Sequence, residues 1–493
     1  MDQNISIQSV LARSQTIAGS TLWAYMMFIL LGLVVPWVLF VNSEGEFSAN
    51  VLLMLCIVVW CQLRLAYTGL TGQRRLTLMC FYAFIYVFLG VQPLLSISTH
   101  AFPNNIYLSD GLVTFTGLLV ILGIVAFETG YVFGYRKVDA ARLYKHPSKI
   151  MSLRMLWYVT AAVSGLTVLA ILFYGPGLFV YGGDVFGSRE IGQTESLLVT
   201  FGVRVPAAVL LFLAVYLWKA YKCLALPGYR VWSLRAALLF LGVLNFVVSM
   251  PFTTPRLWMG SLLLTVLFIS MRWRGIRSFL IWTTLACLSL LILFSGTDPR
   301  RFAAQLNRDE SITPASVTLL IKDAVQGLGT DANFDAFAML ASTTQYTDNY
   351  GYSWGHQLLL PGFFWVPRSI WNSKPEGTPK SVADFINLYN LNVSCPLWAE
   401  GYVNFGIFGV FMFLFFFGWL ARVGDDFQVQ ATGRPGPALQ TVISSFFAAN
   451  TFILLRGDLT SGTMYLQLVI VFSFLILFLN RCLKTPRPMI YGN

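Results

Sequence analysis

The chain contains about a dozen apolar runs, most of them near the length of a membrane-spanning helix. A bilayer has a hydrocarbon core about 30 Å thick, which a helix of about 20 apolar residues crosses. Only 11% of the 493 residues are charged, whereas a typical soluble protein has about 25%. We therefore expect an all-α polytopic transmembrane bundle. The predicted spans lie near 21–41, 50–69, 76–98, 110–134, 155–176, 197–218, 234–250, 257–271, 278–295, 402–420, 439–455 and 460–480.

Positive charge is unevenly distributed between the two sets of connecting loops. If the N-terminus is cytoplasmic, the loops on the same side carry most of the Lys and Arg residues. The short loops on the opposite side carry only Arg189, Arg256 and Arg456. Because cytoplasmic loops are enriched in such residues, we expect both termini in the cytoplasm. Membrane insertion then accounts for the net charge of +11 without a nucleic-acid partner.

One connection, 296–400, is much longer than the others, and the charge count assigns it to the outer side of the membrane. Loops of this length usually carry structure or function. Thr313-Pro314 and Thr378-Pro379 are typical of helix starts. The expected organisation is spans one to nine in 1–295, a large, partly helical outer loop in 296–400, and the last three spans with a cytoplasmic tail in 401–493.

The most informative part of this loop is the segment 367–375, in which Arg368 and Lys374 lie between two prolines. A guanidinium group matches the geometry of phosphate oxygens, and an ammonium group adds a compact charge. The segment therefore indicates an anion site, and pyrophosphate is the natural candidate. The alternative is a turn whose cations contact lipid headgroups, and residue chemistry alone leaves both open.

Arg204 falls inside the sixth predicted span, near its outer end. A charge in a span usually faces a cavity or a partner, although it can also extend to the membrane surface. Arg456 is followed by Asp458, so a local ion pair is the simple interpretation there. Together with Arg368 and Lys374, the arginines of the outer side would line an anion-binding cavity.

Glu400 opens the tenth predicted span, and the helix dipole alone favours an acid at that position. An alternative is that it orients an arginine or an acceptor hydroxyl. His356 lies in the outer loop near the arginine segment, either as a general base or as an interfacial histidine without a role.

The segment beginning at Asp331 resembles the start of a calcium-binding loop. Its sixth position is Ala336 rather than glycine and its twelfth is Ser342 rather than glutamate, so calcium binding is not expected. A helix cap at Asp331 or Asn333 is the simpler interpretation. The sequence contains no nucleotide-binding loop and no metalloprotease motif, and it supports no metal site.

The architecture and two sequence strings resemble the bacterial O-antigen polymerase (Wzy-type) family. The strings are Pro-Arg-Ser-x-Trp-x-x-Lys-Pro at 367–375 and Glu-Gly-Tyr-x-Asn-Phe-Gly at 400–406. The resemblance implies a metal-independent glycosyltransferase of the bacterial inner membrane that needs no cofactor. Its donor and acceptor would be oligosaccharide units on undecaprenyl pyrophosphate, joined at the periplasmic face. A chain-length regulator protein is a further implied partner, besides membrane lipids.

The resemblance also implies roles for individual residues. The pyrophosphate leaving group would be bound by Arg368, Lys374, Arg256 and Arg189, with Arg204 and Arg456 in a second tier. The candidates for activating the acceptor hydroxyl are Glu400, Asp335 and His356.

Two other functions stay open from the sequence. An O-antigen ligase would use the same donor but transfer the glycan to the lipid A core. A flippase or transporter of lipid-linked glycan would show paired repeats and charges near the bilayer midplane. The polar residues of this chain concentrate in the outer loop instead.

Overall fold

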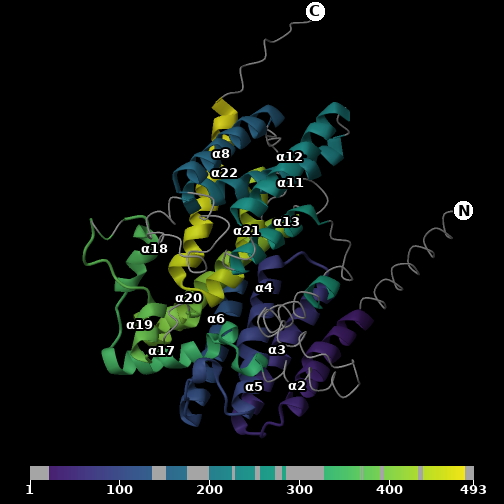
Figure 1. Ribbon diagram of the computed structural model, residues 1–493. Coiled ribbons are helices and arrows are strands. Elements are labelled where there is room, and N and C mark those ends of the chain that lie inside the picture. Colours follow the sequence, from purple (N-terminus) through teal and green to yellow (C-terminus); the bar gives the residue numbers. More distant parts are fainter. Residues whose placement is uncertain are drawn as a thin grey trace, which may run out of the picture.

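In the computed structural model the chain folds into helices and short helical turns, as the apolar runs predict (Figure 1). The structure describes residues 21–135, 152–174, 199–224, 228–249, 256–271, 280–284, 327–366, 368, 370–388, 393–430 and 437–482, and these ranges contain no strand. Ten helices within them are long and apolar enough to cross a membrane, and Leu257–Ser270 is a shorter apolar helix. The all-α polytopic fold is confirmed.

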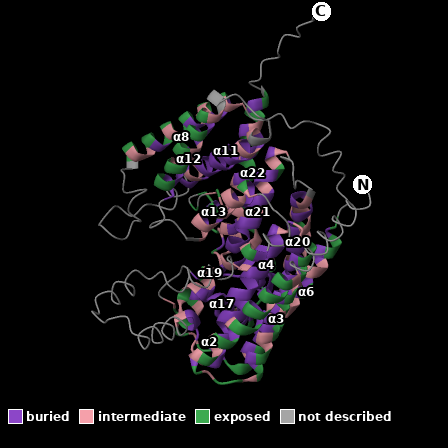
Figure 2. Ribbon diagram, turned by 90° about the vertical axis from the view of Figure 1, so that its right-hand side faces the viewer, coloured by how far each residue is buried: buried purple, intermediate pink, exposed green. Residues whose placement is uncertain are grey.

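The N-terminal helices pack into one hydrophobic core. Its centre is the continuous helix Leu76–Ser98, which is buried along its length, whereas α3 and α6 expose one side (Figure 2). The elements are η1 (Phe28–Val34), α2 (Val35–Ser43), α3 (Ala49–Thr71), α4 (Leu76–Phe84), η2 (Ile85–Val91), α5 (Gln92–Ser98), η3 (Pro103–Asn105) and α6 (Asp110–Phe133).

A second core forms around α11, which is also largely buried. Its elements are α8 (Leu153–Tyr174), α11 (Val205–Leu224), α12 (Gly228–Val248), α13 (Arg256–Ser270), α21 (Ala438–Arg456) and α22 (Leu459–Cys482), and η4 (Thr200–Arg204) leads into α11. Between α13 and α21 in sequence lie η5 (Ala332–Phe334), α17 (Ala336–Tyr350), η6 (His356–Leu358), α18 (Leu359–Phe363), α19 (Thr378–Phe385) and α20 (Leu397–Gln430).

In the described ranges, three spans contain a π-helical turn, and a proline follows each turn closely. η1, η2 and η4 are followed one residue into the next helix by Pro36, Pro93 and Pro206, respectively. A proline lacks an N–H group, and its ring clashes with the carbonyl four residues earlier in a regular α-helix. Widening the preceding turn relieves this clash, so the spans continue through their prolines.

Several sequence predictions can be compared with these bounds. The short eighth span is found as α13, and the Thr378-Pro379 helix is found as α19. Asp331 caps η5, because its side chain accepts a hydrogen bond from the N–H of Asn333. The predicted helix at Thr313-Pro314 lies outside the described residues, as does the ninth span except for 280–284.

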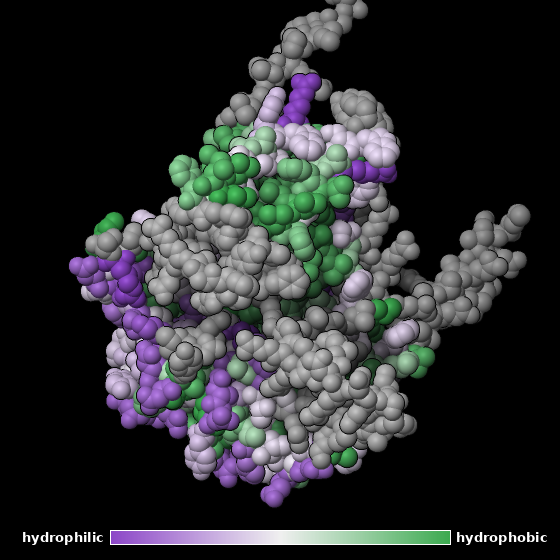
Figure 3. Space-filling view, in the orientation of Figure 1, coloured by the Kyte–Doolittle hydropathy of each residue, from purple (hydrophilic) through white to green (hydrophobic). Residues whose placement is uncertain are grey.

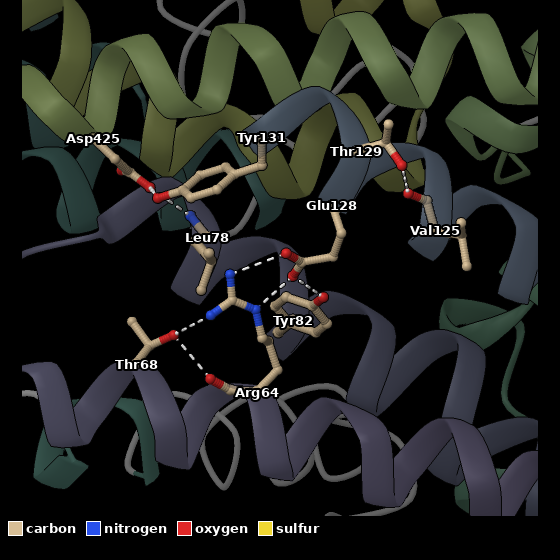
Figure 4. A network of polar contacts seen from close by, with 9 residues as sticks. All are labelled: Arg64, Thr68, Leu78, Tyr82, Val125, Glu128, Thr129, Tyr131 and Asp425. Atoms are coloured by element: carbon tan, nitrogen blue, oxygen red, sulfur yellow. Dashed lines mark hydrogen bonds and ion pairs between the residues drawn. The ribbon is translucent and has the colours of Figure 1, made fainter. Parts of the chain in front are cut away.

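Three charged residues inside the spans, Arg64, Glu128 and Asp425, have polar partners, as Figure 4 shows. Arg64 of α3 points toward Glu128 of α6 and forms two hydrogen bonds with its carboxylate, at 2.6 and 3.0 Å, and Tyr82 of α4 donates to the same carboxylate. Asp425 of α20 accepts from the hydroxyl of Tyr131 and from two N–H groups at the start of α4. These contacts join α20 to helices more than 290 residues earlier in the chain.

Helix α20 is not straight. It breaks at Phe405 and Gly406, and Gly406 has a φ of 62°, which favours glycine. The chain folds back at this point, so that the backbones of Gly401 and Gly409 touch. A side chain on Gly409 would overlap the carbonyl oxygen of Gly401. We call this arrangement, 397–410, the hairpin.

The two legs of the hairpin run in opposite directions along α6. In the first leg, Trp398 donates to the carbonyl of Val120, whereas Tyr402 contacts Phe115, nearer the start of α6. Beyond the hairpin the second leg continues as the rest of α20, where Gly418 packs against the backbone of Phe127, farther along α6. The part of α20 after the break is 407–430, a length of about 36 Å. The predicted tenth span, 402–420, lies within α20, and the break at Phe405 and Gly406 falls inside it.

We predict that Gly409→Ala destabilises the protein by about 1–3 kcal/mol, because the two legs must separate to accommodate a methyl group. Thermal unfolding of the purified protein in detergent measures this change. The matched control is Gly242→Ala in α12, where an added methyl meets nothing within 4 Å. Equal unfolding temperatures for the two variants would contradict close contact between the legs.

Candidate functional site

The part of the long 296–400 connection that the structure describes packs onto the hairpin and onto the turn between α21 and α22. α17 contacts α6, α19 and α20, and α18 contacts α22. Figure 1 shows α17 and α19 close to α20. Gln467 of α22 donates to the carbonyl of Pro361 in α18, at 3.0 Å. The loop is thus attached to helices that come after it in sequence. Candidate residues of the loop and of those helices meet at this contact.

Glu400 lies in the first leg of the hairpin with its side chain almost fully buried. Its Oε1 accepts a hydrogen bond from the N–H of Leu459 at 3.1 Å. Its Oε2 lies 2.9 Å from the hydroxyl of Thr378, which is also 2.5 Å from Oε1 of Gln357. Because Leu459 and Thr378 are the first residues of α22 and α19, one carboxylate joins three helix starts.

Asp335 is also buried, at the N-cap position of α17. It accepts hydrogen bonds from the backbone N–H and the hydroxyl of Ser394, and Nη2 of Arg456 lies 3.8 Å from its Oδ1. Burial raises the pKa of Asp335 above its usual value, and the nearby Arg456 offsets part of this shift. Arg456 also donates through Nε to the carbonyl of Asn333, at 3.0 Å. The ion pair of Arg456 is therefore with α17, whereas the sequence suggested Asp458.

Arg368 and Lys374 fold their segment back on itself. The two terminal nitrogens of Arg368 donate to the carbonyls of Lys374 and Pro375, at 2.8 and 3.2 Å. The ammonium group of Lys374 donates to the carbonyls of Phe364 and Val366, at 2.9 and 2.8 Å. Neither cation forms an ion pair with a carboxylate of the described residues. Partial burial, and then the charge of Arg368, lower the pKa of Lys374.

Both cations keep hydrogen-bonding capacity for a ligand. A guanidinium has five N–H donors and an ammonium has three. The contacts with carbonyls use two donors of each group. The segment therefore carries two neighbouring positive charges. Their own hydrogen bonds to backbone carbonyls hold the segment in place.

The other predicted residues lie around this segment or outside the described part of the chain. Arg204 is half-buried, with its Nε 3.4 Å from the carbonyl of Val248. One turn before it, Phe201 contacts Phe364, whose carbonyl accepts from Lys374, so Arg204 lies near the cationic segment. Arg189 and the side chain of Arg256 lie outside the described residues.

Of the three candidates for activating a hydroxyl, His356 is exposed, at the start of η6. Glu400 and Asp335 are buried, and both oxygens of each carboxylate have donors or an ion-pair partner from the protein. This geometry favours positioning roles for the two acids. The identity of the base stays a prediction.

The sequence did not indicate Thr378, Gln357 or Ser394 as members of the site. Thr378 was recognised only as a helix start, and no local pattern links its hydroxyl to a carboxylate 22 residues later. The membrane-embedded Arg64 and Glu128 did carry a signal, since charges within predicted spans usually have partners.

Neither the side-chain arrangement nor the comparisons with known proteins identify a metal or a family. Among the described residues, no group of three or more His, Cys, Asp or Glu side chains is arranged to hold a metal ion. Comparison of the chain with protein-family models, with curated proteins and with solved structures finds no match.

We predict that Arg456→Met makes stability fall more steeply with rising pH than it does in the wild type. Without Arg456 the pKa of buried Asp335 rises further, and an acid with a raised pKa in the folded state stabilises the fold only while it is protonated. The variant should therefore lose stability as the pH rises from about 4. The expected loss at pH 8 is about 3–5 kcal/mol.

Unfolding temperatures at pH 5 and pH 8 measure this effect. The control is the double variant Arg456→Met with Asp335→Asn, which has no carboxylate to ionise and should lose the extra pH dependence. An equal loss for Arg456→Met at both pH values would contradict the pairing.

Proposed function

We propose that this chain is a glycosyltransferase that polymerises oligosaccharide units carried on undecaprenyl pyrophosphate, at the outer face of a bacterial inner membrane. The observation that carries the proposal is the segment with Arg368 and Lys374. It holds two neighbouring cations without a carboxylate partner among the described residues, on a helical bundle of membrane-spanning type. A lipid-linked pyrophosphate matches that combination of charge and location.

In the proposed reaction, a hydroxyl oxygen of the acceptor sugar attacks the anomeric carbon of the donor glycan. The bond from this carbon to the pyrophosphate oxygen breaks, and the leaving group takes both bonding electrons. The hydroxyl proton passes to a base, for which exposed His356 is the best placed of the three candidates. Arg368 and Lys374 stabilise the charge that develops on the pyrophosphate. The leaving group is already activated, so these steps balance without another reactant.

Deleting the gene and analysing surface polysaccharide on a gel tests the proposal. We predict that the deletion strain makes single-unit product and that the wild-type gene restores a ladder. Arg368→Ala should lower the polymerisation rate by about 100- to 1000-fold, because the transition-state charge loses a donor. The control is Arg154→Ala, an exposed arginine at the start of α8, which should restore the ladder.

The same gel distinguishes other functions. Surface polysaccharide of normal chain length after deletion would contradict the polymerase proposal. Loss of all surface glycan, with long polymer left on its lipid, would point to a ligase.

A second prediction separates positioning from catalysis at Glu400. Gln can still accept from the N–H of Leu459 and donate to Thr378, whereas Ala leaves both groups without a partner. We therefore expect Glu400→Gln to restore the ladder and Glu400→Ala to fail at equal membrane abundance. If Glu400→Gln is as inactive as Glu400→Ala, Glu400 acts as the base instead.

A further inference from the structure

Three large aromatic side chains, at every second position from the end of α17 onward, are exposed beside the hairpin. Tyr350 ends α17 and is 68% exposed, and Trp354 is 74% exposed. Tyr352, between them, is 41% exposed. We call Tyr350, Tyr352 and Trp354 the aromatic platform. Exposure of this much aromatic surface to water is unfavourable in free energy, and a ligand that covered the rings would remove that penalty.

The platform is fixed in place by hydrogen bonds to the hairpin. The N–H of Ser353 donates to the carbonyl of Val403 at 2.9 Å, and its hydroxyl donates to Oδ1 of Asn404 at 2.7 Å. The ring of Tyr352 lies against Gly406. These contacts use residues of the 400–406 string, so that string supports both Glu400 and the platform.

Trp354 has an unusual backbone conformation as well as an exposed ring. Its φ is 48°, a region that residues with a side chain rarely adopt. A glycine would adopt it without strain. Trp354 and Gly355 form the middle of a turn closed by the hydrogen bond from the N–H of His356 to the carbonyl of Ser353, at 3.0 Å, and the ring of Trp354 contacts that of Tyr352. Strain of this kind is found at functional sites, where a side chain must be held in one place.

The charges around the platform distinguish it from a lipid-facing surface. Asp348 is exposed on α17 and lies close to Tyr402, which contacts Tyr352. Asp384 is exposed on neighbouring α19. Figure 3 shows hydrophilic side chains gathered at the lower left, where Figure 1 has α17 and α19, and hydrophobic ones in the upper part. Carboxylates repel the phosphates of lipid headgroups, so this surface does not suit a bilayer.

Aromatic faces next to carboxylates suit a carbohydrate. The C–H faces of a sugar ring pack on aromatic rings, and its hydroxyl groups donate to carboxylates and amides. We propose that the aromatic platform, with Asp348, binds sugar rings of the glycan while the segment of Arg368 and Lys374 binds the pyrophosphate. This assignment rests on the proposed function and adds a separate subsite to it.

Binding to the purified full chain in detergent tests the assignment. The probe is the oligosaccharide released by mild acid from the producing strain's own surface polysaccharide, measured by calorimetric titration. Tyr350→Ala and Trp354→Gly should each weaken binding about tenfold, which corresponds to one aromatic contact. Phe47→Ala is the matched control, because Phe47 is an exposed aromatic side chain in the α2–α3 connection, and it should bind as the wild type does.

Trp354→Gly also separates binding from folding. Because glycine relieves the strained φ, its unfolding temperature should equal or exceed that of the wild type while its binding falls. Unchanged oligosaccharide binding in both platform variants, or no binding by the wild type, would overturn the inference.

Failure of this subsite and failure of the polymerase proposal give different results. If the subsite alone is wrong, Arg368→Ala still abolishes the ladder whereas the platform variants bind oligosaccharide normally. If the polymerase proposal is wrong, deleting the gene leaves chain length unchanged, whatever the purified protein binds.

Discussion

The fold of the candidate site depends on the hydrogen bonds of one buried carboxylate, that of Glu400. It accepts from the first residue of α22 and contacts the hydroxyl of the first residue of α19, while it belongs to the first leg of α20. Backbone N–H groups at a helix start have no partner within their own helix. Glu400 satisfies one such group, the N–H of Leu459, and thereby fixes where α22 begins, and its contact with the hydroxyl of Thr378 holds the start of α19 beside it. The 296–400 connection, the hairpin and the last span therefore meet at Glu400.

The hairpin explains why the carboxylate of Glu400 lies next to the starts of α19 and α22. Gly401 and Gly409 let the two legs touch, and Gly406 allows the reversal between them. Trp398 fixes the first leg on α6. Deep burial of a charged group is costly unless it is hydrogen-bonded. The ion pair of Asp335 with Arg456 follows the same rule. The buried acids therefore support the structure of the site, whereas Arg368, Lys374 and the aromatic rings are accessible to a ligand.

The surface of the 296–400 connection has two chemically different parts. Arg368 and Lys374 lie in a segment that also exposes Trp365 and Ile370, a combination suited to a charged headgroup at an apolar boundary. The platform combines tyrosine and tryptophan with carboxylates, a combination suited to neutral polar rings. A substrate with a lipid pyrophosphate at one end and sugars at the other would match both parts.

The sequence by itself determined the helical class and most of the spans, because about 20 apolar residues in a bilayer have no alternative to a helix. It also indicated α19 and the cap at Asp331, since these depend on neighbouring residues. Only the tertiary structure decided that Arg456 pairs with Asp335, that Glu400 meets Thr378 and Leu459, and that α20 reverses at Gly406. Those contacts join residues up to 121 positions apart, so no local pattern specifies them. They depend on how the helices pack.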